Sequence, residues 1–288
     1  MRQHLITAIA ACLAFATLPA NAQTLGAQKD ALFAYPATLE ERDGGAYRVV
    51  DYRELRDVNE RDEIPERRVR RDYVSLGVRS QQKEMKLETA AGTLRFVAVG
   101  KQAKASMIVL YLHGQGGSRR QGVDDFTFGG NFNRVKNLVS AAGGLYLSPD
   151  FSTFGDKGAA EISALIAHYR EASPGARVFV ACGSMGGALC WKLAQDPQTS
   201  SGLGGLLLLG SLWDETFLSS PAYRAKVPVF FGHGSRDTVF PVASQEAFYR
   251  KLRAGKYPVR FVRFETGTHG TPIRMTDWRE TLIWMLQQ

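Results

Sequence analysis

The sequence predicts one α/β domain with a mostly parallel sheet of about eight strands and helices on both faces. Six continuous apolar runs lie between Ser106 and Glu265, and segments with helical spacing separate them. Strands that are apolar on both sides are typical of a parallel sheet covered by helices. The chain has 288 residues, of which 44% are hydrophobic and 22% charged, and no internal repeat or low-complexity linker divides it. We therefore expect a single domain over residues 73–288.

The predicted elements follow one another in a regular order. Two alternating segments come first and should form an antiparallel hairpin, residues 73–80 and 93–100. The apolar runs then occupy 106–112, 144–149, 177–182, 203–210, 227–232 and 259–265. Helical spacing or a helix-start signal marks 131–143, 156–173, 242–255 and 271–286. Strands that alternate with helices are the pattern of a parallel sheet.

The N-terminus has the pattern of a secretory signal peptide. Arg2 precedes an uncharged apolar stretch, Leu5 to Leu18, and Ala20-Asn21-Ala22 follows the small-x-small rule for cleavage. The stretch is shorter than the roughly 20 residues of a membrane span, so an uncleaved anchor is the lesser alternative. Residues 9–12 also resemble a lipoprotein cleavage box, but cleavage there would leave a very short signal. We expect residues 1–22 to be removed and the mature chain, without a stable membrane span, to be periplasmic or secreted if the source is bacterial.

Residues 23–72 are polar and are predicted to form an extension that lies over the domain. Its densest charged stretch, Arg53 to Asp72, contains seven arginines and seven acidic residues, so its charge cancels. The chain has a formal net charge of +8, but the basic residues are spread along the sequence. Nucleic-acid binding requires a concentrated basic surface, so we expect no nucleic-acid partner.

Two cysteines would remain after removal of the signal peptide with Cys12. If a turn lies around residue 184, Cys182 ends a strand and Cys190 lies two turns into the next helix. Their side chains then need not meet at disulfide distance. We expect two free, buried cysteines rather than a bridge.

Three reactive side chains each follow an apolar run: Ser184, Asp237 and His269. Ligands of open α/β sheets bind beyond the carboxyl ends of the strands, so these side chains should meet at one edge. An imidazole there can take the proton of a serine hydroxyl, and a carboxylate can orient the imidazole. The combination predicts a catalytic triad, although a glycine-flanked serine alone would more often be a turn residue.

Glycine-rich segments supply candidates for the oxyanion hole. The sequence CGSMGG surrounds Ser184, and HGQGG follows the first parallel run. A tetrahedral intermediate needs preorganised N–H donors, which we expect to be the backbone amides of Gln115 and Met185.

Other polar residues at the same sheet edge have simpler interpretations. His113 and His233 are expected to hold loops through hydrogen bonds. Asp214 is an alternative acid, but it could equally cap the short helix that follows it. Cys182 as the nucleophile would be buried at a strand end and therefore inert.

These motifs resemble those of the α/β-hydrolase family over residues 73–288. HGQGG corresponds to the oxyanion loop, CGSMGG to the nucleophile elbow, HGSRDTVFP to the acid loop and GTHG to the segment around the base. The resemblance implies hydrolysis through an acyl-enzyme, without a metal or an organic cofactor. One position departs from the family pattern, because Cys182 stands where the elbow usually has glycine. Only 16 residues, 211–226, separate the fourth and fifth apolar runs, so we expect no large cap domain.

The expected function is hydrolysis of small-molecule carboxylic esters. Ser184 would attack, His269 would act as base and then as acid, and Asp237 would orient His269. A peptidase, an amidase or an acyltransferase could use the same triad, although the sequence shows no charged anchor for a peptide terminus. A catalytically silent binding protein would normally have lost a triad member, and none is missing. The sequence indicates neither the particular substrate nor the oligomeric state.

Overall fold

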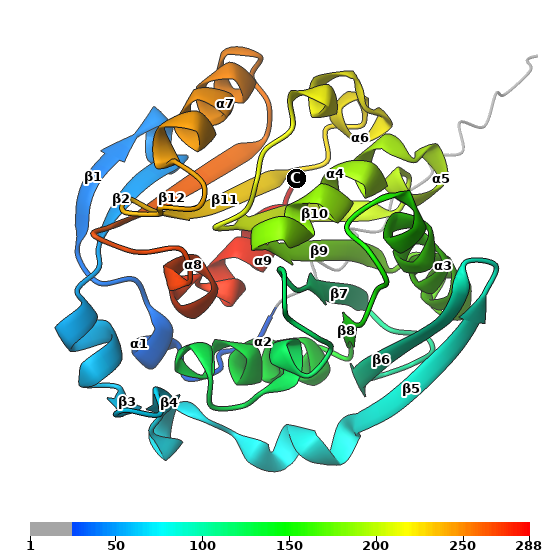
Figure 1. Cartoon of the computed structure of the whole chain (residues 1–288), viewed down its shortest axis with the longest axis horizontal. Coiled ribbons are helices and arrows are strands. Elements are labelled where there is room, and N and C mark those ends of the chain that lie inside the picture. Colours follow the sequence, from blue (N-terminus) through cyan, green and yellow to red (C-terminus); the bar gives the residue numbers. More distant parts are fainter. Residues whose placement is uncertain (1–24) are drawn as a thin grey trace, which may run out of the picture.

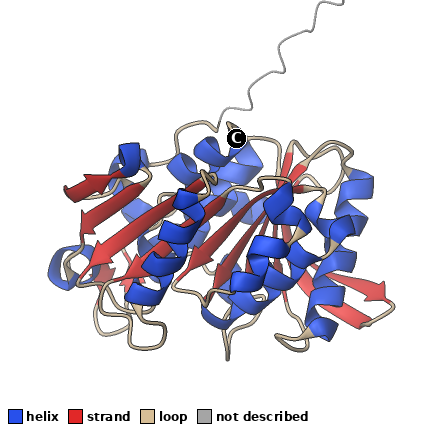
Figure 2. Ribbon diagram, turned by 90° about the horizontal axis from the view of Figure 1, so that it is seen from above, coloured by secondary structure: helices blue, strands red, loops and turns tan. Residues whose placement is uncertain are grey.

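A ten-stranded mixed sheet, with strand order β1-β2-β12-β11-β10-β9-β7-β8-β6-β5, forms the centre of the molecule. Helices cover both of its faces (Figures 1 and 2). The computed structural model describes residues 25–288, so the predicted signal peptide, the lipoprotein box and Cys12 lie outside the described residues. No helix within residues 25–288 is long and apolar enough to cross a membrane.

Each of the six apolar runs forms a strand, as the sequence predicts. They are β7 (Met107–Leu112), β8 (Leu145–Pro149), β9 (Arg177–Gly183), β10 (Leu203–Leu209), β11 (Val229–Gly234) and β12 (Val259–Glu265). Each lies parallel to its neighbours in this group. Every residue of β7, β10 and β11 is buried, because helices cover the sheet on both faces.

The antiparallel hairpin at one end of the sheet consists of β5 (Gln82–Thr89) and β6 (Gly92–Gly100). The predicted strand at 73–80 is wrong, since these residues form 3-10 turns at Arg71–Tyr73 and Leu76–Gln81. β5 is an edge strand that carries charged side chains and packs only Met85 and Leu87 against the core. Its sequence therefore lacks the apolar alternation that marks a half-buried strand.

The N-terminal segment is part of the sheet rather than a layer over it. It contributes β1 (Thr38–Arg42) and β2 (Tyr47–Asp51), which raises the number of strands above the predicted eight or so. β2 pairs in parallel with β12 and buries Tyr47, Val49 and Val50. This apolar stretch is too short for its periodicity to stand out in a charged segment.

The main helices are α2 (Asn131–Ala141), α3 (Asp156–Ala172), α4 (Gly187–Gln195) and α7 (Val242–Ala254), with short helices α1 (Asp30–Phe33), α5 (Pro197–Ser200) and α6 (Pro221–Arg224). The segment 271–286, predicted as one helix, contains two: α8 (Thr271–Met275) and α9 (Trp278–Leu286). The break occurs because the Asp277 carboxylate accepts hydrogen bonds from the amides of Arg279 and Glu280 and so caps α9.

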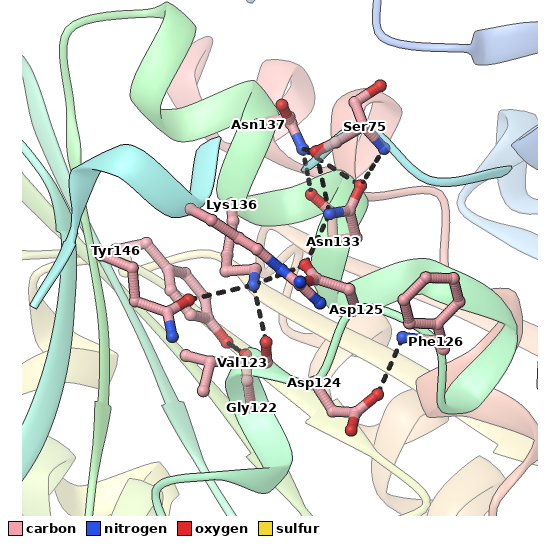
Figure 3. A network of polar contacts seen from close by, with 12 residues as sticks. Ser75, Gly122, Val123, Asp124, Asp125, Phe126, Asn133, Lys136, Asn137 and Tyr146 are labelled. Atoms are coloured by element: carbon pink, nitrogen blue, oxygen red, sulfur yellow. Dashed lines mark hydrogen bonds and ion pairs between the residues drawn. The ribbon is translucent and has the colours of Figure 1, made fainter. Parts of the chain in front are cut away.

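A buried polar network fixes the long loop between β7 and α2 (Figure 3). The fully buried Lys136 of α2 donates from Nζ to Asp125 Oδ1 at 2.7 Å and to the Val123 carbonyl at 2.6 Å. Asp125 also accepts from Asn133 Nδ2 at 2.6 Å and from Arg79 Nε at 2.6 Å. Burial would raise the pKa of Asp125, but the hydrogen bonds from Lys136 and Asn133 outweigh it and lower the pKa. The loop is therefore held by an ionised, hydrogen-bonded pair.

Replacement of Lys136 by Met tests this network. Lys136→Met keeps the apolar length of the side chain but leaves the buried Asp125 carboxylate without its buried cation, since Arg79 is largely exposed. We expect the free energy of unfolding to fall by about 3 kcal/mol in urea denaturation. Lys251→Met is the matched control, because Lys251 pairs with Glu215 on the surface, and it should cost less than about 1 kcal/mol. Equal effects of the two substitutions would contradict this account.

Candidate active site

Ser184 lies on the sharp turn between β9 and α4. Its backbone φ is +51°, a left-handed conformation that is uncommon for a residue other than glycine. The turn Ser184–Gly186 leads directly into α4. A strained backbone conformation persists only where the surrounding structure holds it in place, and such conformations are concentrated at functional sites.

The glycines after Ser184 allow α4 to approach the sheet closely. A Cβ atom at Gly186 would lie 2.5 Å from the Leu112 carbonyl oxygen, and one at Gly187 would lie 2.1 Å from Ser211 Oγ. Ser211 also donates a hydrogen bond of 2.6 Å to the Ser184 carbonyl. The glycines of CGSMGG are therefore required by close packing around the turn.

His269 lies within hydrogen-bond distance of both other side chains of the predicted triad. His269 Nε2 is 2.8 Å from Ser184 Oγ, and His269 Nδ1 is 2.8 Å from Asp237 Oδ2. Both contacts are satisfied when Nδ1–H donates to Asp237 and Nε2 accepts from the serine hydroxyl, so we assign this tautomer. The Asp237 side chain is fully buried, whereas the His269 side chain is 29% exposed. The imidazole is therefore accessible to a ligand from solvent, whereas the carboxylate of Asp237 is not accessible to solvent.

The acid loop holds Asp237 in its ionised form. Asp237 Oδ1 accepts hydrogen bonds from the amides of Val239 at 2.8 Å and Phe240 at 3.0 Å. Burial raises the pKa of Asp237, but the hydrogen bonds from His269 and these amides outweigh it and bring the pKa below its ordinary value. His233 donates from Nε2 to the Phe240 carbonyl at 2.7 Å, so it holds the loop as predicted.

The loop after β7 passes directly against the serine. A Cβ atom at Gly114 would lie 2.8 Å from Ser184 Cβ. His113 donates from Nδ1 to the Gly114 carbonyl at 2.8 Å and stacks on Phe151 with 4.3 Å between ring centres. Burial lowers the pKa of His113, which favours the neutral ring.

The hydrogen bond from His113 also orients the next amide. In a trans peptide the C=O and N–H point in opposite directions, so a fixed Gly114 carbonyl fixes the N–H of Gln115. That N–H has no acceptor among residues 25–288. Met185, the other predicted donor, directly follows the serine. Gly114, the residue that precedes Gln115, packs against the serine. The role of both amides as oxyanion donors stays a prediction.

The segment between β10 and β11 contains no cap domain, as predicted. It holds only the 3-10 turn Glu215–Ser219 and α6. Asp214 accepts from the Thr216 amide at 2.9 Å, which supports its interpretation as a cap. Within the described part of the chain, no group of three or more His, Cys, Asp or Glu side chains is arranged to hold a metal ion.

Cys182 and Cys190 form a disulfide, so the prediction of two free cysteines is wrong. Their Cα atoms lie 6.4 Å apart, within the range that a bridge allows. The tight turn brings Cys190, in the first turn of α4, back against the end of β9, which the spacing of eight residues alone did not reveal. The bridge encloses Ser184 and ties the two ends of its turn together. A bonded sulfur cannot act as a thiolate, which excludes Cys182 as the nucleophile.

The sequence did not predict that residues 52–73 lie at the sheet edge that carries the triad. We call these residues the N-terminal strap. Because β2 is parallel to β12, the strap begins at the same sheet edge as the triad. It contains the small hairpin β3 (Asp62–Glu63) and β4 (Arg68–Val69), and the chain then continues to β5 at the far end of the sheet (Figure 1). The sequence feature that could have indicated this position is the short apolar run of β2, because polar residues follow it as they follow the strands that carry the triad.

Solved structures match most of this chain. A protein of unknown function from Agrobacterium tumefaciens, described as a proposed α/β hydrolase, is 16% identical over 71% of this chain and 95% of that chain, with a TM-score of 0.56. An esterase from Pyrococcus furiosus is 17% identical over 72% and 90%, with a TM-score of 0.52. A lid-less α/β serine hydrolase from Xanthomonas campestris is 15% identical over 72% and 94%, with a TM-score of 0.51. No family model matches the sequence, and a search of the curated proteins gave no significant match. The chain has the α/β-hydrolase fold, as its motifs predict.

Proposed function

We propose that this protein is a serine hydrolase that cleaves carboxylic esters through an acyl-enzyme. The observation that carries the proposal is the continuous hydrogen-bonded chain from Ser184 through His269 to the buried Asp237. The Gln115 amide supports it, because it follows Gly114 at the serine, has no acceptor within residues 25–288, and an acyl-transfer site needs donors for an oxyanion. The fold of esterases such as that of Pyrococcus furiosus is consistent with the same chemistry.

In the first half-reaction, Ser184 Oγ attacks the ester carbonyl carbon while its proton passes to His269 Nε2. The ionised Asp237 stabilises the imidazolium and keeps Nε2 directed at the serine. The amides of Gln115 and Met185 donate to the oxyanion of the tetrahedral intermediate. The intermediate collapses when His269 returns the proton to the leaving oxygen, and the alcohol departs.

In the second half-reaction, water replaces the alcohol. His269 takes a proton from this water, whose oxygen attacks the acyl carbon of the Ser184 ester. The second tetrahedral intermediate uses the same two amides. Its collapse releases the carboxylic acid and restores the serine hydroxyl by a proton from His269.

We also propose that the protein is exported and that residues 1–22 are removed. The N-terminal signal pattern supports this location. The Cys182–Cys190 disulfide supports it independently, because such bridges persist in oxidising compartments outside the cytoplasm.

Substitution of Ser184 tests the proposed nucleophile. Ser184→Ala should lower kcat for p-nitrophenyl acetate by roughly 10⁴-fold or more, since no other group can form the acyl-enzyme. Ser201→Ala, at an exposed serine away from the site, is the matched control and should retain wild-type turnover. Retention of a tenth of the activity by Ser184→Ala would rule out Ser184 as the nucleophile. Aminoacyl p-nitroanilides measured in parallel should be poor substrates, and faster turnover of these amides would assign the site to an amidase.

Analysis of the mature protein tests export and the bridge together. Protein recovered from the periplasm or medium of an expressing bacterium should begin at Gln23 in N-terminal sequencing. After denaturation, Cys182 and Cys190 should react with iodoacetamide only if a reductant was added first. A mature chain that retains residues 1–22, or cysteines alkylated without reduction, would contradict the corresponding proposal.

A further inference from the structure

The loop that follows β10 lies between the nucleophile and the acid–base pair. β10 is the strand between β9, which leads to Ser184, and β11, which leads to Asp237 (Figure 1). The first two residues after β10 contact both sides of the triad. A Cβ atom at Gly210 would lie 2.6 Å from the His269 carbonyl oxygen. The hydroxyl of the next residue, Ser211, donates a hydrogen bond of 2.6 Å to the Ser184 carbonyl.

We propose that Ser211 is a positioning residue, which directs the Met185 amide at the oxyanion by holding the Ser184 carbonyl. This role rests on the proposed hydrolase function and adds to that site a residue that touches neither the substrate nor the other triad side chains. Gln245 of α7 is a second positioning residue, because it holds Ser211 in turn.

The Ser184 carbonyl and the Met185 amide belong to one peptide unit. A trans peptide is planar and its C=O and N–H point in opposite directions, so a donor that fixes the carbonyl also fixes the N–H. This N–H lies at the start of the turn Ser184–Gly186, where helical N–H groups have no partner within the helix. Ser211 can therefore set the direction of an amide to which it is not bonded.

Two donors hold the Ser184 carbonyl. The Gly187 amide, where α4 begins, donates to it from within the turn. Ser211 donates from the end of β10 and so ties the same peptide to the sheet. Ser184 has a φ of +51°, a conformation that persists only where the surrounding structure supports it. The bond from Ser211 supplies such support from outside the turn.

Ser211 is itself fixed by its surroundings. Ser211 and Gln245 are both fully buried, and Gln245 Nε2 donates to the Ser211 carbonyl. A Cβ atom at Gly187 would lie 2.1 Å from Ser211 Oγ, so glycine at this position leaves room for the hydroxyl. In a buried site of low dielectric the hydrogen bond of the hydroxyl is stronger than in water. The direction of the Ser184 carbonyl is therefore well determined.

The other proposed oxyanion donor is supported in the same manner. His113 donates to the Gly114 carbonyl at 2.8 Å, which fixes the amide of Gln115. Each amide is thus oriented by a side chain that binds the carbonyl of the same peptide unit. The two supporting side chains follow β7 and β10, which are the strands on either side of β9.

Substitution of Ser211 by alanine removes the hydroxyl with little change in volume. Loss of a whole oxyanion donor costs about 10²–10³-fold in kcat, so a misdirected donor should cost about tenfold. We expect kcat for p-nitrophenyl acetate to fall by about this factor, while KM changes less than about twofold. Trifluoroacetophenone carries a negative charge on oxygen once Ser184 has added to its carbonyl carbon. Its inhibition constant should rise by the same factor as kcat falls.

Two controls separate positioning from a loss of stability. Ser200→Ala removes another buried hydroxyl that donates to a backbone carbonyl, that of Pro197 at 3.1 Å, in α5 beyond the C-terminal end of α4. It should leave kcat and the inhibition constant unchanged. The pH at which kcat/KM is half-maximal reports the ionisation of His269, which is not bonded to Ser211, and it should be the same in Ser211→Ala.

Gln245→Met repeats the test without a change in the loop after β10. It removes the donor to the Ser211 carbonyl and should lower kcat and raise the inhibition constant together, by a smaller factor than Ser211→Ala, with circular dichroism unchanged. This variant carries the test if Ser211→Ala does not fold, and wild-type kinetics in Gln245→Met would overturn the role of Gln245.

Three results would overturn the role of Ser211 while the hydrolase stands. They are wild-type kcat in Ser211→Ala, a fall in kcat with an unchanged inhibition constant or a shifted pH profile, and an equal effect of Ser200→Ala. Wild-type protein that does not hydrolyse p-nitrophenyl acetate would overturn the proposed function and the positioning role with it.

Discussion

The hydrogen bond between His269 Nδ1 and the buried Asp237 carboxylate is the interaction on which the rest of the site depends. In the neutral ring it places the proton on Nδ1 and directs Nε2 at Ser184 Oγ, which is the arrangement that nucleophilic attack requires. The carboxylate is in turn fixed by two loop amides, and His233 fixes the loop. Asp237 and His269 follow the neighbouring strands β11 and β12, and Ser184 follows β9, on the other side of β10, so the parallel sheet determines how far apart they lie.

The turn that carries Ser184 is held by close packing and a disulfide rather than by hydrogen bonds to a carboxylate. Close backbone packing at Gly186 and Gly187 seats α4 against the sheet, and the Cys182–Cys190 bridge closes the turn around Ser184. The family pattern has glycine at the position of Cys182, and here a small side chain also fits because its sulfur points to α4 and bonds there. The neighbouring loop is fixed by His113 near Gln115 and by the buried Lys136 network farther along. The turn that carries Ser184 and the loop that carries Gln115 are thus both held by contacts within the protein itself.

Much of this arrangement could be predicted from the sequence, because long apolar runs identify parallel strands and strand ends identify the site. Ser184, Asp237 and His269 each lie where that reasoning places them. The local sequence pattern did not predict the elements whose formation depends on tertiary contacts or on a single side chain. β2 is short and lies in charged sequence, and the break before α9 depends on a single capping carboxylate, Asp277. The disulfide depends on the geometry of the turn at Ser184, and the strap depends on how distant segments meet, so neither spacing nor composition could reveal them.

The central claim is that His269 activates Ser184 as a nucleophile. A fluorophosphonate probe tests it most directly, because the probe forms a stable bond only with an activated serine and its position can be mapped by mass spectrometry. We predict one label, on Ser184, and labelling at least about 100-fold slower in a folded His269→Ala variant, since general-base assistance contributes roughly 10²–10⁴-fold. A folded wild-type protein that remains unlabelled, or is labelled at another residue, would contradict the account.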